Sequence, residues 1–314
     1  MHPTLFTIGR WNIPTYTVLL DLGLILALVL IYREGRRQGG AGTAAGRGDR
    51  VSGEAALDLG LWVVIGGVLG GRIGHVLANR SLFSEDWTRA FRIWEGGLAW
   101  RGAFLGGLMI LALLSWRRGS AGRQQPSGQD PVPRADSLAF LSRLLSWADL
   151  LTPALALGLA FGWAACLMGG CAYGAIGEGW GMVVLPDLAG LEAPRFPTQA
   201  LGTAFCLLLF VGFWFLRGRW PFRGAAFLTF CLFHFGAQFF LEFTRGDESA
   251  YLGPWRLGQA LDFALALIAA AGLLVLWWRA PEVDEARGLL EESDLAELPP
   301  SVVAGDAPLP GEDA

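Results

Sequence analysis

Seven long apolar runs constrain this chain more than any other feature. They lie at about residues 13–32, 56–78, 94–116, 146–168, 198–216, 224–243 and 257–278. Each is close to the roughly 20 residues that a helix needs to cross a bilayer core. Hydrophobic residues make up 53% of the 314 residues and charged residues only 17%, more apolar than a soluble domain normally is. The sequence therefore predicts an all-α polytopic membrane protein, a bundle of about seven transmembrane helices.

Arginines indicate how the bundle is oriented. The sequence has no lysine, so arginine supplies all 24 cationic Lys/Arg side chains. The connections after the first, third and fifth runs are rich in arginine: Arg33, Arg36, Arg37, Arg47 and Arg50; Arg117, Arg118, Arg123, Arg134 and Arg143; Arg217, Arg219 and Arg223. Because cytoplasmic loops carry the excess of positive charge, we predict the N-terminus outside and, after seven spans, the C-terminus in the cytoplasm.

The chain divides into two parts by composition. Residues 1–280 form the predicted membrane domain, and the first run is too long to be a cleaved signal, so we expect it to remain as an anchor. Residues 281–314 contain ten acidic residues and a single arginine, Arg287. Acidic, proline-containing tails are usually solvated, so we predict a disordered cytoplasmic tail rather than a docking segment.

Arg72 stands in the middle of the apolar stretch VLGGRIGHVLA, residues 68–78, where His75 is the other polar side chain. A charge at this depth requires a partner or water. Since Glu242 ends the sixth run, we expect Arg72 to lie beside Glu242 or beside a lipid phosphate.

Further polar residues lie near the predicted outer ends of the runs, namely Tyr16, Arg101 and Arg245. Three arginines with one glutamate leave a net positive charge, and guanidinium groups bind phosphate oxygens in pairs. This pattern favours a site for an anionic headgroup. The alternative is structural: Arg72 pairs with Glu242, Arg245 extends to the membrane surface, and Tyr16 belongs to an aromatic belt.

Glycines and cysteines leave two questions open. Glycine pairs at 66–71, 96–97, 106–107 and 169–170 either allow close helix packing or leave space for a ligand. Cys166 and Cys171 are either core thiols or a disulfide, and Cys206 and Cys231 lie within apolar runs. No CxxC or HxxxH spacing accompanies them, so we expect no metal site. The glycine-rich segment 169–181 could fold back over a site.

Five segments in order resemble the prolipoprotein diacylglyceryl transferase family. They are GGRIGHVL at 70–77, WEGGLAWRGAFLGG at 94–107, GWAACLMGGCAYG at 162–174, RFPTQ at 195–199 and AQFFLEFTR at 237–245. They are similar to the family elements GGR-x-G-Y, W-x-GG-x-x-x-HGG-x-x-GG, GR-x-x-C-x-x-x-GC-x-x-G, RHPTQ and FR-x-x-x-E-x-x-R. The resemblance extends from IPTYTVLLDLG at residue 13 to RLGQALDF at residue 256.

The resemblance implies a reaction in lipoprotein maturation. A diacylglyceryl group passes from phosphatidylglycerol to the lipobox cysteine thiol of a secreted preprolipoprotein, on the outer side of the bacterial cytoplasmic (inner) membrane. The implied partners are phosphatidylglycerol, preprolipoproteins and the membrane, without nucleic acid. No metal or organic cofactor is implied.

The sequence departs from the family at several of these elements. Trp163 and Gln238 replace two arginines, and Arg101 replaces the histidine of the HGG element. His75 replaces a tyrosine, and Phe196 replaces a histidine. The residues that still match are Tyr16, Arg72, Gln199, Glu242 and Arg245. We therefore predict Arg101, Arg72 and Glu242 as catalytic residues, and Tyr16, His75, Gln199, Gln238 and Arg245 as substrate-binding residues.

Two interpretations of these departures belong to different classes. In the first, Arg101 supplies the lost cation and the chain is an active transferase. In the second, the chain is a catalytically impaired paralogue that binds anionic lipid or lipobox peptide without turnover. A transport role is less favoured, because the sequence lacks the paired, interrupted helices that many transporters carry.

Overall fold

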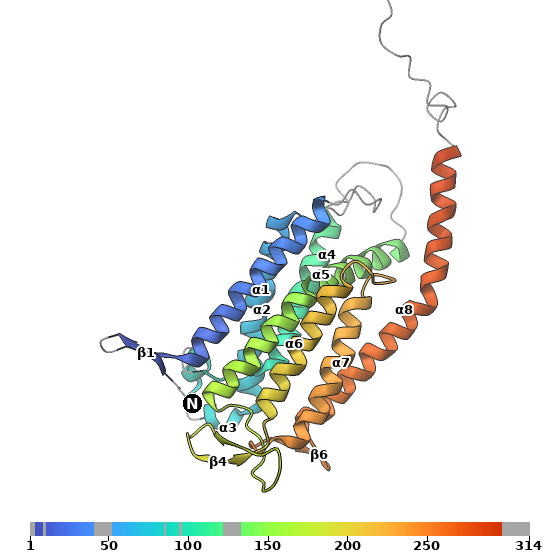
Figure 1. Cartoon of the computed structure of the whole chain (residues 1–314). Helices are drawn as coiled ribbons and strands as arrows, with labels where there is room; N and C mark the ends of the chain where they lie inside the picture. Colours follow the sequence, from blue (N-terminus) through green and yellow to red (C-terminus); the bar gives the residue numbers. More distant parts are fainter. Residues whose placement is uncertain are drawn as a thin grey trace, which may run out of the picture.

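The computed structural model describes residues 4–8, 11–40, 52–84, 86–93, 96–121 and 133–296. Its long helices form an elongated bundle (Figure 1). The helices are α1 (Thr15–Gly40), α2 (Gly53–Ala78), α3 (Arg80–Phe83), α4 (Trp100–Ala121), α5 (Pro133–Gly169), α6 (Thr198–Leu216), α7 (Ala225–Leu241) and α8 (Leu257–Ala296), with short 3-10 helices η1 (Trp87–Phe91) and η4 (Glu242–Thr244).

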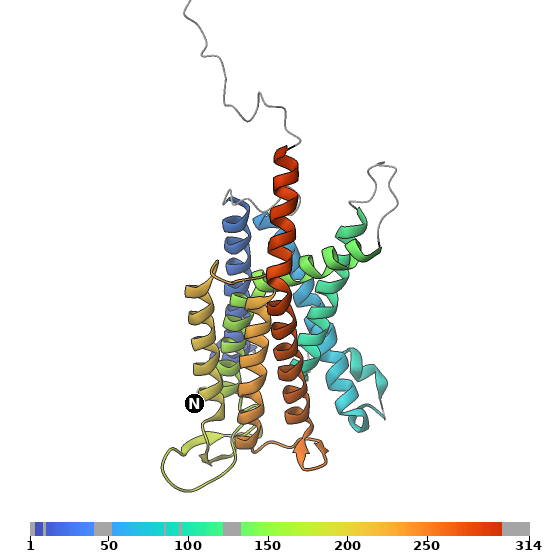
Figure 2. The same cartoon turned by 90° about the vertical axis from the view of Figure 1, so that its right-hand side faces the viewer.

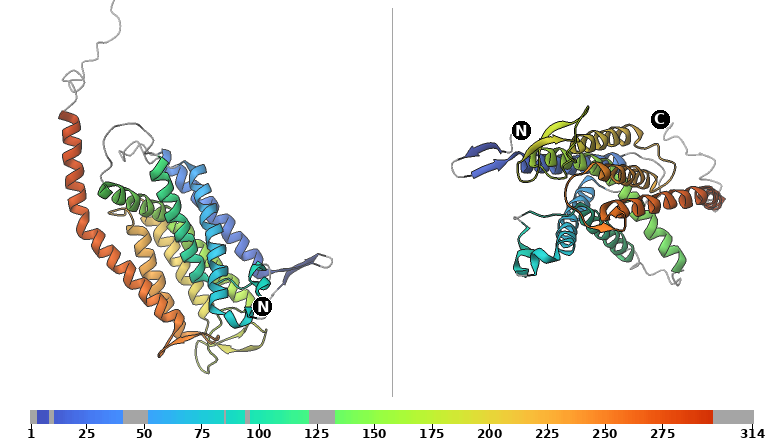
Figure 3. Two further views of the ribbon diagram at one scale, coloured as in Figure 1. Left: turned by 180° about the vertical axis from the view of Figure 1, so that it is seen from behind. Right: turned by 90° about the horizontal axis from the view of Figure 1, so that it is seen from below.

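Three antiparallel hairpins lie at one end of this bundle. They are β1 (Thr4–Ile8) with β2 (Trp11–Pro14), β3 (Val183–Pro186) with β4 (Glu192–Arg195), and β5 (Tyr251–Leu252) with β6 (Trp255–Arg256). The N-terminus is at the same end, and the first hairpin projects away from the helices (Figure 3). We call this the hairpin end. The C-terminal end of α1 and the N-terminal end of α2 lie at the opposite end (Figure 1).

Six helices in the described part of the chain are long and apolar enough to cross a membrane. Their spans are Thr15–Gln38, Gly53–Ala78, Ala139–Gly169, Thr198–Leu216, Ala225–Thr244 and Leu257–Arg279. The prediction of a helical, multi-pass membrane protein is confirmed, but the count of seven is not.

The third predicted run forms α4, which is not among these six helices. Its apolar stretch between Arg101 and Arg117 is short. The helix also begins later than predicted, at Trp100. Gly96 and Gly97, just before it, have φ angles of 85° and 79°, which a right-handed helix does not accommodate.

The last helix is longer than the sequence predicts. Residues 281–296, expected to begin a disordered tail, continue α8 as far as Ala296, and residues 297–314 lie outside the described part of the chain. This segment is rich in glutamate, alanine and leucine, which favour helix strongly. The distal part of α8 extends beyond the other helices (Figure 2).

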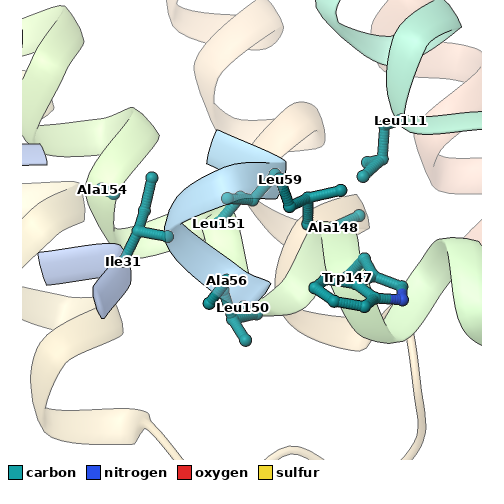
Figure 4. Close-up of a cluster of buried hydrophobic side chains, with 9 residues drawn as sticks. All are labelled: Ile31, Ala56, Leu59, Leu111, Trp147, Ala148, Leu150, Leu151 and Ala154. Carbon is teal, nitrogen blue, oxygen red and sulfur yellow. The ribbon is translucent and has the colours of Figure 1, made fainter. Parts of the chain in front are cut away.

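Two clusters of buried side chains hold the bundle together. The first joins α1, α2, α4 and α5 through residues such as Ile31, Leu59, Leu111 and Leu151 (Figure 4). The second joins α5, α6, α7 and α8 around phenylalanines of α6 and α7, and α4 packs against it through Trp100 and Phe104. Because α4 and α5 contribute to both clusters, they join the two sides of the bundle.

Glycines bring α2 and α4 into backbone contact. A Cβ atom placed on Gly70 would lie 2.4 Å from the carbonyl oxygen of Gly102 and 2.7 Å from the Cα atom of Gly106. Such distances leave no space for a side chain or a ligand. At this interface the glycines therefore serve close helix packing, one of the two alternatives left open by the sequence.

Replacing Gly70 with alanine should therefore destabilise the bundle. The clash is with backbone atoms, so the two helices must separate, and overpacking of this kind costs about 1–3 kcal/mol. The matched control is Gly67→Ala, because a Cβ there meets only the Ala103 carbonyl oxygen, at an ordinary 3.5 Å. Thermal unfolding of both purified variants in detergent is the measurement. Equal melting temperatures for the two variants would contradict the packing role.

Candidate active site

A buried group of charged side chains lies at the hairpin end, where α4, α7 and α8 meet. We call it the charge cluster. Its members are Arg101, Glu242, Arg245, Asp247, Arg256 and Asp262. They come from α4, from the segment after α7, from β6 and from α8. The tertiary structure thus brings together charges that are more than a hundred residues apart in sequence.

Arg101 links α4 to the other elements of this cluster. Its Nη2 group donates to Glu242 Oε1 at 2.8 Å and to Asp262 Oδ2 at 2.6 Å, and its Nε group donates to Asp262 Oδ1 at 3.0 Å. Its Cζ atom lies 5.1 Å from the centre of the Trp100 ring. The Nη1 group has no hydrogen bond to any residue that the structure describes, and the side chain is 19% exposed. Arg101 therefore points inward and presents one open edge.

Glu242 is the buried anion at the centre of the cluster. Its Oε1 atom also accepts a hydrogen bond from Arg245 Nη1 at 2.8 Å, and its Oε2 atom lies 3.3 Å from Arg256 Nε. A Cβ atom on Gly258 would lie 2.6 Å from both Arg101 Nη2 and Glu242 Oε1. Glycine at the start of α8 is thus what lets this ion pair form. A carboxylate buried this deeply needs such partners to remain charged.

Asp247 balances the remaining positive charge. Its carboxylate pairs with Arg245, whose Nε donates to Oδ1 at 2.8 Å, and with Arg256, whose Nη2 lies 3.2 Å from Oδ1. Burial raises the pKa of the Asp247 carboxyl, but the hydrogen bond from Arg245 and the charges of Arg245 and Arg256 together hold the pKa below its usual value. Three arginines therefore face three carboxylates, and the predicted net positive charge is wrong for the described residues.

Arg72 lies outside the charge cluster. It donates to the carbonyl oxygens of the segment between α3 and α4: those of Ala90 at 2.8 Å, Gly96 at 2.5 Å, Gly97 at 3.2 Å, Arg89 at 2.5 Å and Arg92 at 3.1 Å. These bonds use all the N–H groups of a guanidinium. The first of the two alternatives predicted for Arg72, a position beside Glu242, is wrong, because a chain bend directs backbone carbonyls at this arginine.

The other predicted site residues come from four different helices. The His75 ring lies against Gly97, since a Cβ atom there would be 2.4 Å from His75 Nε2. Tyr16 lies against Gly169, where a Cβ atom would be 3.0 Å from Tyr16 Cδ2. Gln199 is buried and donates to the Cys171 carbonyl oxygen at 3.1 Å. Gln238 is buried one turn before Glu242. Of the eight predicted residues, the structure joins three in the cluster by ion pairs: Arg101, Glu242 and Arg245.

The chain that follows a disulfide contacts the segment that carries Glu242 and Arg245. Cys166 and Cys171 form a disulfide, the second of the two alternatives in the sequence, and Cys206 and Cys231 are free and buried. Beyond the disulfide, the Ala175 amide donates to the Thr244 carbonyl oxygen at 2.8 Å, and the Gly246 amide donates to the Tyr173 carbonyl oxygen at 2.9 Å. The glycine-rich segment therefore folds back over this part of the site.

Asp262, Arg256 and His234 are not among the site residues predicted from the sequence. Asp262 is the only acidic residue in the last apolar run, and its isolation there was a usable signal, since a charge in a span requires a partner. His234 is wholly buried between the rings of Trp100 and Phe230, 5.3 Å from each, and neither ring nitrogen has a hydrogen-bond partner among the described residues. The contact of His234 with Trp100, the residue before Arg101, follows from tertiary packing alone.

Trp163, which replaces an arginine of the family element, lies between two helices. The indole ring lies over α6 at Gly202, where a Cβ atom would be 2.4 Å from Trp163 Cδ2. The ring therefore packs α5 against α6.

Comparison with known proteins places these features in a family. A sequence model described as "Prolipoprotein diacylglyceryl transferase" matches residues 3–128 and 135–278. A phosphatidylglycerol–prolipoprotein diacylglyceryl transferase of Gloeobacter violaceus is 29% identical over 287 residues, covering 88% of this chain and 92% of that protein. The enzyme of the same name from Geobacter sulfurreducens is 28% identical, covering 85% of this chain and 92% of that protein. A phosphatidylglycerol–prolipoprotein diacylglyceryl transferase 2 of Clostridium perfringens is 25% identical, covering 84% of this chain and 90% of that protein. Because the family model matches most of the chain, this protein belongs to the prolipoprotein diacylglyceryl transferase family.

Proposed function

We propose that this chain transfers the diacylglyceryl group of phosphatidylglycerol to the lipobox cysteine of secreted prolipoproteins, at the outer face of the bacterial inner membrane. The observation that carries the proposal is the open Nη1 edge of Arg101 on an otherwise paired, buried charge cluster. The names of the relatives state both substrates.

The proposed reaction exchanges one bond for another at a glycerol carbon. The cysteine sulfur attacks the diacylglyceryl carbon that bears the phosphodiester oxygen; a carbon–sulfur bond forms and the carbon–oxygen bond breaks. The leaving group is glycerol phosphate, and the thiol proton balances the charge that it gains. Because negative charge grows on the departing oxygen, a fixed cation at that position lowers the barrier.

Arg101 is the residue that we assign to this task. Glu242 and Asp262 hold its Nε and Nη2 groups, so the Nη1 group is directed by the fold before substrate binds. A preorganised donor of this kind needs no rearrangement during the reaction. Arg245 supports Glu242 from the other side. We further propose that Tyr16, His75, Gln199 and Gln238 contact the lipid or the peptide.

Charge balance in the cluster favours a second candidate function. Each arginine of the cluster already faces a carboxylate, and Trp163 and Gln238 stand where the family has arginines. A site with fewer free cations could bind the lipid or the lipobox peptide without stabilising the transition state. A transfer assay with a lipobox peptide distinguishes these two functions.

Arg101→Ala should lower the transfer rate by about 10²- to 10³-fold, because it removes one preorganised donor. The measurement is transfer of labelled diacylglycerol from phosphatidylglycerol to a lipobox peptide. Arg80→Ala is the matched control, since Arg80 is an exposed arginine near the same end of the bundle. Trp163→Arg should add little, because Arg101 already supplies the cation.

Three outcomes of this assay would change the assignment. Undiminished transfer by Arg101→Ala would remove Arg101 from the mechanism. A large gain in Trp163→Arg would show that Arg101 does not replace the missing arginine. No transfer by the native chain, together with retained binding of the lipid or the peptide, would favour the binding protein.

Arg72 is proposed as a positioning residue rather than a phosphate ligand. Arg72→Gln should lower the melting temperature and the amount of protein in the membrane, because the Ala90 and Gly96 carbonyl oxygens lose the donor that Arg72 provides. The KM for phosphatidylglycerol should stay within about twofold. Glu242→Gln should not restore the level, since the two residues are not paired. A large rise in KM at normal stability would return Arg72 to the substrate site.

We also propose that α4 crosses the membrane as a seventh span, with the hairpin end outside. The arginine-rich connections carry this proposal. A cysteine introduced at Thr43, which lies outside the described residues, should resist an impermeant thiol reagent in intact cells. A cysteine at Glu178, on the exposed glycine-rich segment, should react. The reverse pattern would invert the topology.

A further inference from the structure

A second group of arginines surrounds a small pocket far from the charge cluster. The pocket has a volume of about 170 Å³ and lies between the C-terminal ends of α1 and α6 and the middle of α5. Its polar lining consists of Arg33, Glu34, Arg37 and Arg217. These residues lie at the end of the bundle opposite to the hairpins. Since three arginines accompany one glutamate, the lining carries a net positive charge, unlike the charge cluster.

The arginines of this pocket keep donor groups available. The Arg217 guanidinium stacks on the Trp214 ring, with its Cζ atom 3.7 Å from the ring centre. This contact fixes the plane of the group, and its N–H groups, which lie in that plane, have no hydrogen bond to a described residue. Arg37 donates through Nε and Nη2 to Glu34, which leaves its Nη1 group unused among the described residues. Two guanidinium groups are thus held in place with donors unoccupied.

The remaining walls of the pocket are apolar. Leu150 and Ala154, which belong to the first buried cluster (Figure 4), form part of its lining together with Pro153. Pro153 lies inside the continuous helix α5 and has no amide hydrogen to donate. Asp149, one turn earlier, is not part of this lining, and its carboxylate accepts the Gly224 and Phe227 amides at 2.6 and 2.8 Å.

This combination fits a phosphate attached to a lipid. The arginines stand near the ends of two predicted spans, Thr15–Gln38 and Thr198–Leu216, which is the depth of the lipid headgroups. Basic pockets between transmembrane helices on the cytoplasmic side bind anionic headgroups, and apolar walls below the arginines suit the adjoining glycerol and acyl carbons. We propose that the pocket binds the phosphate of an anionic phospholipid from the arginine-rich, cytoplasmic leaflet, at a site separate from the proposed transferase site.

The test compares two double variants of the full chain in detergent. Arg37→Gln/Arg217→Gln removes two pocket arginines, and Arg36→Gln/Arg219→Gln removes two exposed arginines from the same connections outside the pocket. Melting temperature is followed during titration with dioleoyl phosphatidylserine, which is anionic, and dioleoyl phosphatidylcholine, which is zwitterionic. Neither is the proposed substrate, so failure of the transferase proposal leaves this test intact.

Phosphatidylserine should stabilise the native chain and the control variant more than phosphatidylcholine does. The pocket variant should need roughly 30-fold more phosphatidylserine for the same shift. Arg217→Gln alone, which leaves the pair of Arg37 with Glu34 intact, should need roughly fivefold more and serves if the double variant does not fold. Unchanged transfer activity of the variants would place the effect outside the active site.

Three results would overturn the proposal. Equal weakening in both double variants would indicate general attraction to net charge. The same stabilisation by inorganic phosphate, in competition with the lipid, would indicate a site for a small soluble anion. No difference between phosphatidylserine and phosphatidylcholine with the native chain would remove the anion site altogether.

Discussion

The ion pairs of Arg101 with Glu242 and Asp262 are the interaction on which the rest of the site depends. They join α4 to the end of α7 and to the start of α8, three elements that no local sequence pattern brings together. Charges at this depth in a membrane protein are costly unless each finds a partner, so the pairs fix how the helices meet. The same pairs leave the Nη1 group of Arg101 without a hydrogen bond to a residue in the described part of the chain, and this is the group to which we assign the catalytic role.

Glycines make this arrangement possible in two places, beside the ion pair and between α2 and α4. Gly258 lies so close to the ion pair of Arg101 with Glu242 that any side chain would separate the two groups. Farther along α4, Gly102 and Gly106 allow the backbone of α2 to approach closely. In a bilayer, close packing and polar contacts replace the hydrophobic driving force between helices. Small residues therefore determine where the charged residues can meet.

Arg72 and Arg101 show that similar residues in similar apolar surroundings take different roles. Arg72 donates to the carbonyl oxygens of an irregular segment, whereas Arg101 pairs with carboxylates and keeps its Nη1 group unbonded within the described residues. The difference comes from the neighbours: glycines with left-handed φ angles precede α4 and turn carbonyls toward Arg72. Unpaired backbone carbonyls in an apolar environment are as demanding as a charge.

The sequence by itself determined the class of the protein and its family. Apolar runs of membrane-spanning length follow directly from the thickness of a bilayer, and five ordered motifs identified the family that the comparison then showed. It also placed eight residues in one candidate site, of which the structure joins Arg101, Glu242 and Arg245 by ion pairs. These inferences succeeded because they depend on length, polarity and residue identity, which are properties of the chain alone.

Only the tertiary structure decided which charges pair. The sequence offered Glu242 or a lipid phosphate as the partner of Arg72, but the structure pairs Glu242 with Arg101, Arg245 and Arg256, and adds Asp247 and Asp262 to the cluster. It also decided that Cys166 and Cys171 form a disulfide and that α8 continues to Ala296. Hydropathy reports how deep a residue lies along its helix, whereas pairing depends on the rotation of that helix and on the path of the connecting loops. Those quantities are set by packing between distant segments.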